Sequence, residues 1–199
     1  MTQKNALVVI DMSVEQVANI SYRKKEVIET IHRLATSSSF DLIIESHLWI
    51  GPNDGTSLRR LYPGGQMGSE EARLIPELRS VLGDNISADA TSRNGQTKKE
   101  DAKTQRVFVR KYNYSSFAQP STLNDVLKAH QITNVYLCGI NTDYCVFATA
   151  MDAFYESYNV FVVEEGVTSV CGAAGHRQGL EQIKKFGCAK IVSANDIMQ

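Results

Sequence analysis

Residues 135–163 read VYLCGINTDYCVFATAMDAFYESYNVFVV, with an apolar run at each end and the polar loop GINTDYC at residues 139–145. The apolar side chains in both runs are continuous rather than alternating, which is typical of strands buried on both faces. Between the runs, apolar and small side chains recur at helical spacing, at Val146, Thr149, Ala150, Ala153 and Phe154. The segment therefore predicts a strand, a helix and a second strand, with Cys145 where the helix starts.

The same alternation continues along the rest of the chain. Further apolar runs are ALVVI (6–10), DLIIES (41–46), RVFVR (106–110) and AKIVSA (189–194), and a second helical stripe comprises Val27, Ile28, Ile31, Leu34 and Ala35. Alternating strands and helices predict a three-layer α/β/α fold, a parallel sheet with helices on both faces and right-handed crossovers. With 199 residues, of which 43% are hydrophobic, we expect one domain spanning residues 1–199.

Charge and composition argue against several classes of partner. The formal net charge is −1 and the isoelectric point is near 6.4, so we expect neither nucleic-acid nor membrane-surface binding. The apolar run that ends before Asp11 is too short for a signal-peptide core, and we therefore expect a cytoplasmic protein with free thiols. The four cysteines form no C-x-x-C pair, which argues against a structural zinc site.

Two segments interrupt the pattern. Residues 49–69, WIGPNDGTSLRRLYPGGQMGS, are rich in Gly and Pro and predict irregular structure. Residues 84–105 are almost entirely polar, and this pattern fits either a solvated surface excursion or an active-site lid.

Three chemically reactive residues follow predicted strands. Asp11 follows the first strand, Lys111 follows RVFVR, and Cys145 lies in the loop after NVYLCGI. Ligands of open parallel sheets gather beyond the carboxyl ends of the strands, so we expect these three side chains to meet there. We expect the pKa of Cys145 to be lowered by a nearby cation and by the N-terminus of a helix capped by Thr142. We expect Asp11 to accept the thiol proton.

Each of these residues also has a structural interpretation. Asp11 alone fits a cap, and Lys111 alone fits a solvated strand end. Cys138 lies within an apolar run and is expected to be a small buried hydrophobe. It is the combination of an acid, a cation and a thiol at three strand ends that favours catalysis.

The motifs together resemble the isochorismatase-like cysteine hydrolase superfamily, which includes nicotinamidases, N-carbamoylsarcosine amidase and ureidoacrylate amidohydrolase. The resemblance rests on VVIDM (8–12), KYNYSSF (111–117), GINTDYCVFATAMDA (139–153) and the tail from residue 162 to 197. It implies a six-stranded parallel sheet of order 3-2-1-4-5-6 and a catalytic triad of Asp11, Lys111 and Cys145. It also implies a cis peptide between Ile140 and Asn141, an oxyanion hole formed by the N–H groups of Asn141 and Cys145, and a homo-oligomer, dimeric or tetrameric.

The chain departs from nicotinamidases in the residues that would hold a metal. IIESHLWIGPND offers His47 alone, and LYPGGQMGS offers no histidine, so no metal and no other cofactor are expected. His47 either lines the substrate pocket or hydrogen-bonds the turn, and Trp49 is either a pocket wall or a plug beneath a loop. Tyr114 and Tyr144 are further candidates for the pocket.

The leading hypothesis is a metal-independent cysteine hydrolase that cleaves a C–N bond in a small amide or carbamoyl compound through a thioester. The alternatives are a catalytically silent binding protein on the same fold and a redox-reactive thiol protein. Retention of Asp11, Lys111 and Cys145 disfavours the silent protein. The sequence of the irregular segments does not identify the substrate.

Overall fold

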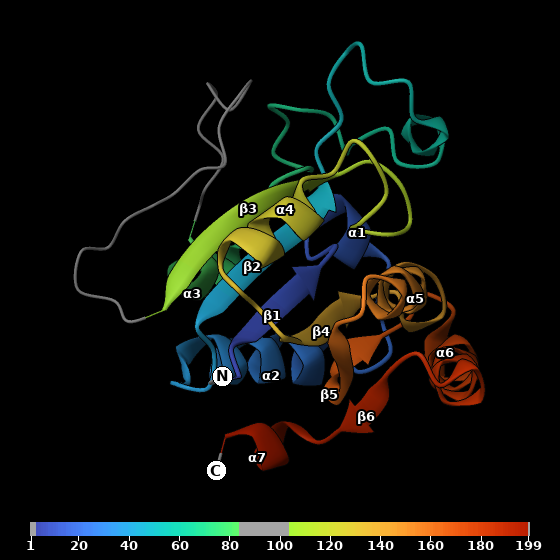
Figure 1. The fold of residues 1–199 in the computed structure, drawn as a ribbon. Coiled ribbons are helices and arrows are strands. Elements are labelled where there is room, and N and C mark those ends of the chain that lie inside the picture. Colours follow the sequence, from blue (N-terminus) through green and yellow to red (C-terminus); the bar gives the residue numbers. More distant parts are fainter. Residues whose placement is uncertain (1–2, 84–103, 199) are drawn as a thin grey trace.

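The computed structural model describes residues 3–83 and 104–198. Its centre is a parallel sheet of six strands, drawn as arrows in Figure 1. The strands are β1 (Asn5–Ile10), β2 (Leu42–Leu48), β3 (Gln105–Lys111), β4 (Asn134–Ile140), β5 (Asn159–Thr168) and β6 (Lys190–Val192). They pair in the order β3-β2-β1-β4-β5-β6, which confirms the predicted topology.

Helices cover both faces of the sheet. One apolar core joins it to α4 (Leu123–Ala129), α5 (Phe147–Tyr155) and α6 (Gly172–Phe186). The other core joins the opposite face to α1 (Val14–Ala18), α2 (Lys24–Thr36), α3 (Pro76–Leu82) and α7 (Ala194–Ile197). Adjacent strand residues alternate between the two cores, as Val8 and Val9 do, and the strands therefore read as continuous apolar runs.

The strand order reverses between β1 and β4, and the two strands lie unusually close at their carboxyl ends. Gly139 has a φ of +105°, and a Cβ atom at this position would lie 2.0 Å from the carbonyl oxygen of Ile10. Only glycine fits such an approach. The pairing of β4 with β5 also shifts register between Leu137 and Gly139. The loops after β1 and β4 therefore come together at the point where the strand order reverses.

The predicted elements and the observed ones agree in kind and differ at their ends. The second strand continues past Ser46 to Leu48, so it includes His47. The helical stripe predicted around Val146 corresponds to α5, but Phe154 does not face the core and is 48% exposed. Among the described residues, no helix combines the length and the apolar character needed to cross a membrane.

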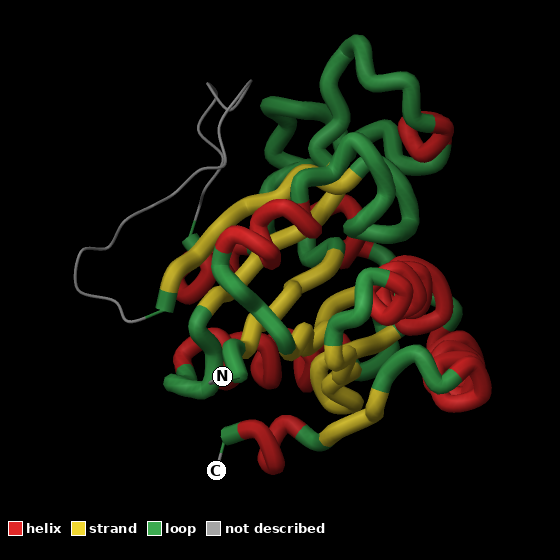
Figure 2. Tube along the Cα trace, in the orientation of Figure 1, coloured by secondary structure: helices red, strands yellow, loops and turns green. Residues whose placement is uncertain are grey.

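The Gly- and Pro-rich segment at residues 49–69 is largely irregular, as predicted. It contains one short 3₁₀ helix, η1 (Ser57–Arg60), and a bridge that pairs Ile50 with Gln66. Figure 2 shows that irregular chain gathers beyond the carboxyl ends of β1, β2 and β3. Residues 84–103 of the polar segment 84–105 lie outside the described residues. The two interpretations of this segment, a surface excursion and a lid, therefore both stay predictions.

Candidate active site

Asp11 is the first residue after β1 and is almost completely buried, with 1% of its surface exposed. Its φ of 55° turns the chain out of the strand, a conformation that Asp tolerates better than most residues. Its backbone N–H donates to the carbonyl of Ser46 at 2.9 Å, which holds this turn against β2. The carboxylate oxygen Oδ1 is buried and has no hydrogen-bond partner among the described residues.

Lys111, the last residue of β3, connects the other two predicted residues. Its side chain is completely buried, and Nζ donates to Asp11 Oδ2 at 2.7 Å and to Cys145 Sγ at 3.4 Å. Burial lowers the pKa of Lys111, but attraction to Asp11 and Cys145 outweighs this effect and raises it. The buried ammonium is therefore retained, and it holds a carboxylate and a sulfur at the same point.

Cys145 lies in η2 (Thr142–Val146), a π-helical turn that leads into α5, and is 2% exposed. Burial and then the carboxylate of Asp11 raise the pKa of its thiol to about 12, although Lys111 acts in the opposite direction. The sequence-based expectation of a lowered pKa is wrong, because it counted the cation and the helix end but not the burial. The resting sulfur is a thiol that needs a base.

The predicted cap of this turn is also wrong. The residue at the N-cap of η2 is Asn141 rather than Thr142, and its side chain makes no capping bond to the turn. Asn141 Oδ1 instead accepts from the N–H of Val170 at 2.7 Å. Thr142 is completely buried and bonds with His176, which the sequence analysis did not single out.

The backbone before Cys145 has one feature that the resemblance implies. The peptide bond between Ile140 and Asn141 is cis. The carbonyl of Asn141 accepts from Tyr144 N–H at 3.1 Å and from Val146 N–H at 3.0 Å. These donors are the residues on either side of Cys145.

Three tyrosines lie in the segments around the three residues. Tyr114 and Tyr144 stack with ring centroids 6.2 Å apart, and both are partly exposed. Tyr62, which the sequence analysis did not identify, lies close enough to interact electrostatically with Cys145 and Asp11. Burial and the charges of Cys145 and Asp11 raise the pKa of the Tyr62 phenol to about 12, against the effect of Lys111. Its hydroxyl therefore stays protonated and can donate a hydrogen bond.

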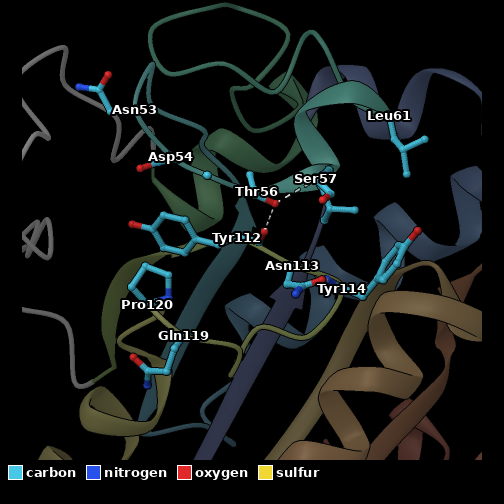
Figure 3. A pocket seen from close by; sticks show the side chains of 12 residues that line it. Asn53, Asp54, Thr56, Ser57, Leu61, Tyr112, Asn113, Tyr114, Gln119 and Pro120 are labelled. Carbon is cyan, nitrogen blue, oxygen red and sulfur yellow. Dashed lines mark hydrogen bonds between the residues drawn. The ribbon is translucent and has the colours of Figure 1, made fainter.

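A pocket of about 770 Å³ lies between residues 53–61 and residues 112–120 (Figure 3). Its walls combine Leu58, Leu61 and tyrosine rings with polar side chains, among them the carboxylate of Asp54. Tyr114, one of the predicted pocket residues, belongs to this wall, and its stacking partner Tyr144 precedes Cys145. The pocket therefore lies beside the segment that follows Lys111.

His47 and Trp49 lie on the other face of the sheet and do not line this pocket. Both are almost completely buried, and Phe108 packs against each of them. Trp49 belongs to an apolar cluster with Ala72 beneath the loop, so the structure favours the plug over the pocket wall. His47 Nδ1 lies 3.1 Å from Glu45 Oε1, a contact within β2 that the sequence analysis missed.

The Glu45–His47 pair has two side chains of metal-ligating type, and no third from the described residues joins them. Within residues 3–83 and 104–198, no group of three or more His, Cys, Asp or Glu side chains is arranged to hold a metal ion. Apart from this 3.1 Å contact with each other, the side chains of Glu45 and His47 have no hydrogen-bond partner among the residues described. The pair is a buried ionisable contact without further support.

A family model, the isochorismatase domain, matches residues 82–196. A ureidoacrylate amidohydrolase from Variovorax paradoxus is 32% identical to the chain over 80 residues, which are 40% of this chain. The match spans 31% of that relative, and the other curated relatives are also matched over about a third of their length.

Solved structures share the fold across nearly the whole chain. A nicotinamidase from Bacillus subtilis superposes with a TM-score of 0.75 at 23% identity, over 96% of this chain and 100% of that one. An N-carbamoylsarcosine amidase from Thermoplasma acidophilum gives a TM-score of 0.63 at 22% identity, over 97% of this chain and 98% of that one. At these identities the likeness is one of fold.

Proposed function

Because the chain belongs to the isochorismatase domain family, we propose that it is a hydrolase that cleaves a C–N bond in a small amide or carbamoyl compound. The named relatives, a ureidoacrylate amidohydrolase, a nicotinamidase and an N-carbamoylsarcosine amidase, act on compounds of this kind. We infer further that Cys145 is the nucleophile and that the reaction passes through a thioester without a metal.

The observation that carries this proposal is the double contact of Lys111. One buried ammonium bonds a carboxylate at 2.7 Å and a sulfur at 3.4 Å. A protein has little reason to bury an acid, a cation and a thiol together for stability alone, since burying charges carries a large desolvation cost. The arrangement favours an enzyme over a silent binding protein.

In the proposed acylation step, Cys145 Sγ attacks the substrate carbonyl while Asp11 accepts the thiol proton. The acceptor is Asp11 Oδ1, which is buried and bonds to none of the residues that the structure describes. The N–H groups of Asn141 and Cys145 stabilise the oxyanion, and Lys111 favours the charged sulfur. When the tetrahedral intermediate collapses, the C–N bond breaks and Asp11 returns the proton to the departing amine.

In the proposed deacylation step, water attacks the thioester. Asp11 takes a proton from the water, the C–S bond breaks, and the proton moves to the leaving sulfur. The products are a carboxylic acid, or a carbamic acid where the substrate is a carbamoyl compound, and the free thiol. The described walls of the pocket beside Tyr114 include one charged side chain, Asp54, and none of Asp11, Lys111 and Cys145 is among them.

The test is ammonia or amine release from a panel of small amides, ureido acids and nicotinamide analogues, measured with the wild type and two cysteine variants. Cys145→Ala should lower turnover by several orders of magnitude, as nucleophile deletions do, by roughly 10⁶ in a well-studied hydrolase. Cys188→Ala, equally buried, is the matched control and should keep turnover. Unchanged turnover in Cys145→Ala would rule out the nucleophile.

Two further proposals concern the whole chain. We infer one domain over residues 1–199, because strands from residue 5 to residue 192 form one sheet, and we expect a single cooperative unfolding transition. We also infer a homo-oligomer, dimeric or tetrameric, which light scattering of the purified protein would measure.

A further inference from the structure

Helix α6 packs its backbone directly against η2, the turn that carries Cys145. Its glycines make this possible: a Cβ atom at Gly179 would lie 2.5 Å from the carbonyl carbon of Thr142 and 2.6 Å from the backbone nitrogen of Asp143. At Gly175 a Cβ atom would lie 2.7 Å from the Asp143 carboxylate. The only way to bring a helix this close is to remove its side chains at the contact.

His176 lies on the same face of α6, 3% exposed, and contacts two segments that are far apart in the sequence. Its Nδ1 lies 3.0 Å from Thr142 Oγ1, and its Nε2 lies 3.1 Å from Arg23 Nη1. A guanidinium can only donate, so Nε2 must be the acceptor and Nδ1 must carry the proton of a neutral ring. The ring therefore donates to the hydroxyl of Thr142.

Arg23 is itself held in place. It makes two bonds to the carboxylate of Glu26, at 2.7 and 2.8 Å, and its φ of 54° places it at the entry to α2. The backbone carbonyl of the preceding residue, Tyr22, accepts from Thr168 Oγ1 at 2.6 Å, and the Tyr22 ring lies 5.7 Å from the ring of His176. His176 thus has a fixed support on the side away from the turn.

We propose that His176 is a positioning residue for the nucleophile, whose neutral ring links Arg23 to Thr142 and fixes the turn that carries Cys145. The catalytic part of this inference rests on the proposed function, in which Cys145 is the nucleophile. The contacts themselves place no atom of His176 on a reacting group, and the residue acts through the Thr142 hydroxyl and the η2 backbone.

The arrangement makes the turn sensitive to acid. A protonated ring would set a second cation against Arg23 and remove the acceptor that Arg23 uses. The charged groups around the ring are Arg23 at the N-cap of α2, Glu26 of α2, Asp143 of η2 and Glu164 of β5, with the phenol of Tyr22 beside it. Burial and then Arg23 lower the pKa of His176 from its usual 6.5, while the three carboxylates oppose them.

The sign of the pH effect follows from this lowered pKa. Below pH 6.5 the unfolded chain binds a proton at this residue that the folded protein resists, so stability rises with pH there. The contribution of the neutral ring is complete above pH 6.5 and is lost as the pH falls toward the lowered value. Order in the turn should decline over the same interval.

Two substitutions separate the two contacts of the ring. In His176→Asn, the amide nitrogen replaces Nδ1 and can still donate to Thr142, whereas in His176→Gln the amide oxygen replaces Nε2 and only the contact to Arg23 survives. His130→Asn is the matched control, because both ring nitrogens of His130 are also bonded, to Val126 O and Gln105 Oε1, at the end of α4.

Hydrogen exchange of a peptide covering residues 141–147, read by mass spectrometry on the full chain, measures the turn without any substrate. We expect His176→Gln to speed exchange there by roughly five- to tenfold, the equivalent of one lost hydrogen bond. His176→Asn keeps the donor to Thr142 but loses the bond from Arg23, so its exchange should lie between those of the wild type and His176→Gln. His130→Asn should stay within about twofold of the wild type. Unchanged exchange in His176→Gln, or equal acceleration in His130→Asn, would overturn the proposal.

Steady-state kinetics on a substrate from the amide panel tests the catalytic consequence. His176→Gln should lower kcat about tenfold with KM within about twofold, and His176→Asn should restore most of kcat. A rise in KM alone, or no rescue by Asn, would contradict positioning. If Cys145→Ala remained active, the proposed function would fall, whereas the exchange result would still decide whether His176 fixes the turn.

Discussion

Two buried polar clusters lie near the carboxyl end of the sheet on opposite faces, and they differ in how their charges are supported. Lys111 shares the face of Val109, toward α4 and α5, and it bonds both Asp11 and Cys145. Glu45 shares the face of Ile43, toward α2 and α3, and its only ionic contact within the described part of the chain is with His47.

The two clusters differ in the features that catalysis requires. The Asp11–Lys111–Cys145 cluster has a cation at its centre and one carboxylate oxygen free to accept a proton. The Glu45–His47 pair has no hydrogen-bond partner among the described residues and packs against Phe108. We therefore expect that removing one charge from the first cluster lowers stability and turnover far more than replacing both residues of the second cluster.

Lys111→Met should produce the largest effect, because it leaves the Asp11 carboxylate buried and uncompensated. We expect a loss of about 3–5 kcal/mol in the free energy of unfolding, measured by urea denaturation. Turnover should fall by roughly 10²- to 10⁴-fold if Lys111 supports the charged sulfur. The double variant Asp11→Asn/Lys111→Met should regain stability and stay inactive. A stable, active Lys111→Met protein would remove the distinction between the clusters.

Alkylation should next distinguish the buried thiol from an exposed one. Cys171 is exposed, whereas burial and Asp11 raise the pKa of Cys145 to about 12, so little thiolate is present at pH 7. Iodoacetamide should label Cys171 first, and labelling of Cys145 should rise about tenfold per pH unit between pH 7 and 10. Peptide mass spectrometry measures both rates, with Cys171→Ser as control. Faster labelling of Cys145 at pH 7 would show that the thiolate is already formed.

Tyr62→Phe should have a smaller effect on the first cluster. The substitution removes one hydroxyl that stays protonated beside Cys145 and Asp11. Loss of a single hydrogen bond to the substrate predicts a fall in kcat/KM of roughly five- to tenfold. Tyr136→Phe is the control, because burial alone raises the pKa of that phenol. Equal effects of the two substitutions would exclude a special role for Tyr62.

Replacing the second cluster should change turnover least. Glu45→Met/His47→Leu substitutes apolar groups for an unsupported ionisable pair, and such replacements are often neutral or stabilising by about 1–4 kcal/mol. We expect turnover within about threefold of the wild type, and the same turnover after EDTA treatment. Two results together would show that the pair is a metal site. The double variant would lose turnover, and the wild type would lose turnover on chelation and regain it with zinc, iron or manganese.

The residues that the sequence could identify are those tied to strand ends. Asp11, Lys111 and Cys145 each follow an apolar run, and a parallel sheet brings such positions to one edge. Glu45 was not identified because the predicted strand ended at Ser46, which made Glu45 part of the strand end. Local patterns do not show which face of a strand a polar side chain will occupy.

Properties that depend on packing were beyond reach of the sequence. The pKa of Cys145 was expected to fall, yet burial by residues distant in sequence dominates. Tyr62 lies in a Gly- and Pro-rich segment without periodicity, and its approach to the site depends on how the loop folds back. His176 lies within an ordinary helical pattern, and only the glycine contact of α6 with η2 reveals its connection to Thr142.

The most direct test of the account is detection of the acyl-enzyme. A confirmed substrate would be mixed with the enzyme, quenched in acid within milliseconds to seconds, and read by intact-protein and peptide mass spectrometry. We expect a mass increase equal to the mass of the substrate minus that of its amine. The adduct should lie on the peptide that contains Cys145, be cleaved by hydroxylamine and be missing in Cys145→Ala. Turnover with an adduct on another residue, or single-turnover conversion by Cys145→Ala at the wild-type rate, would contradict it.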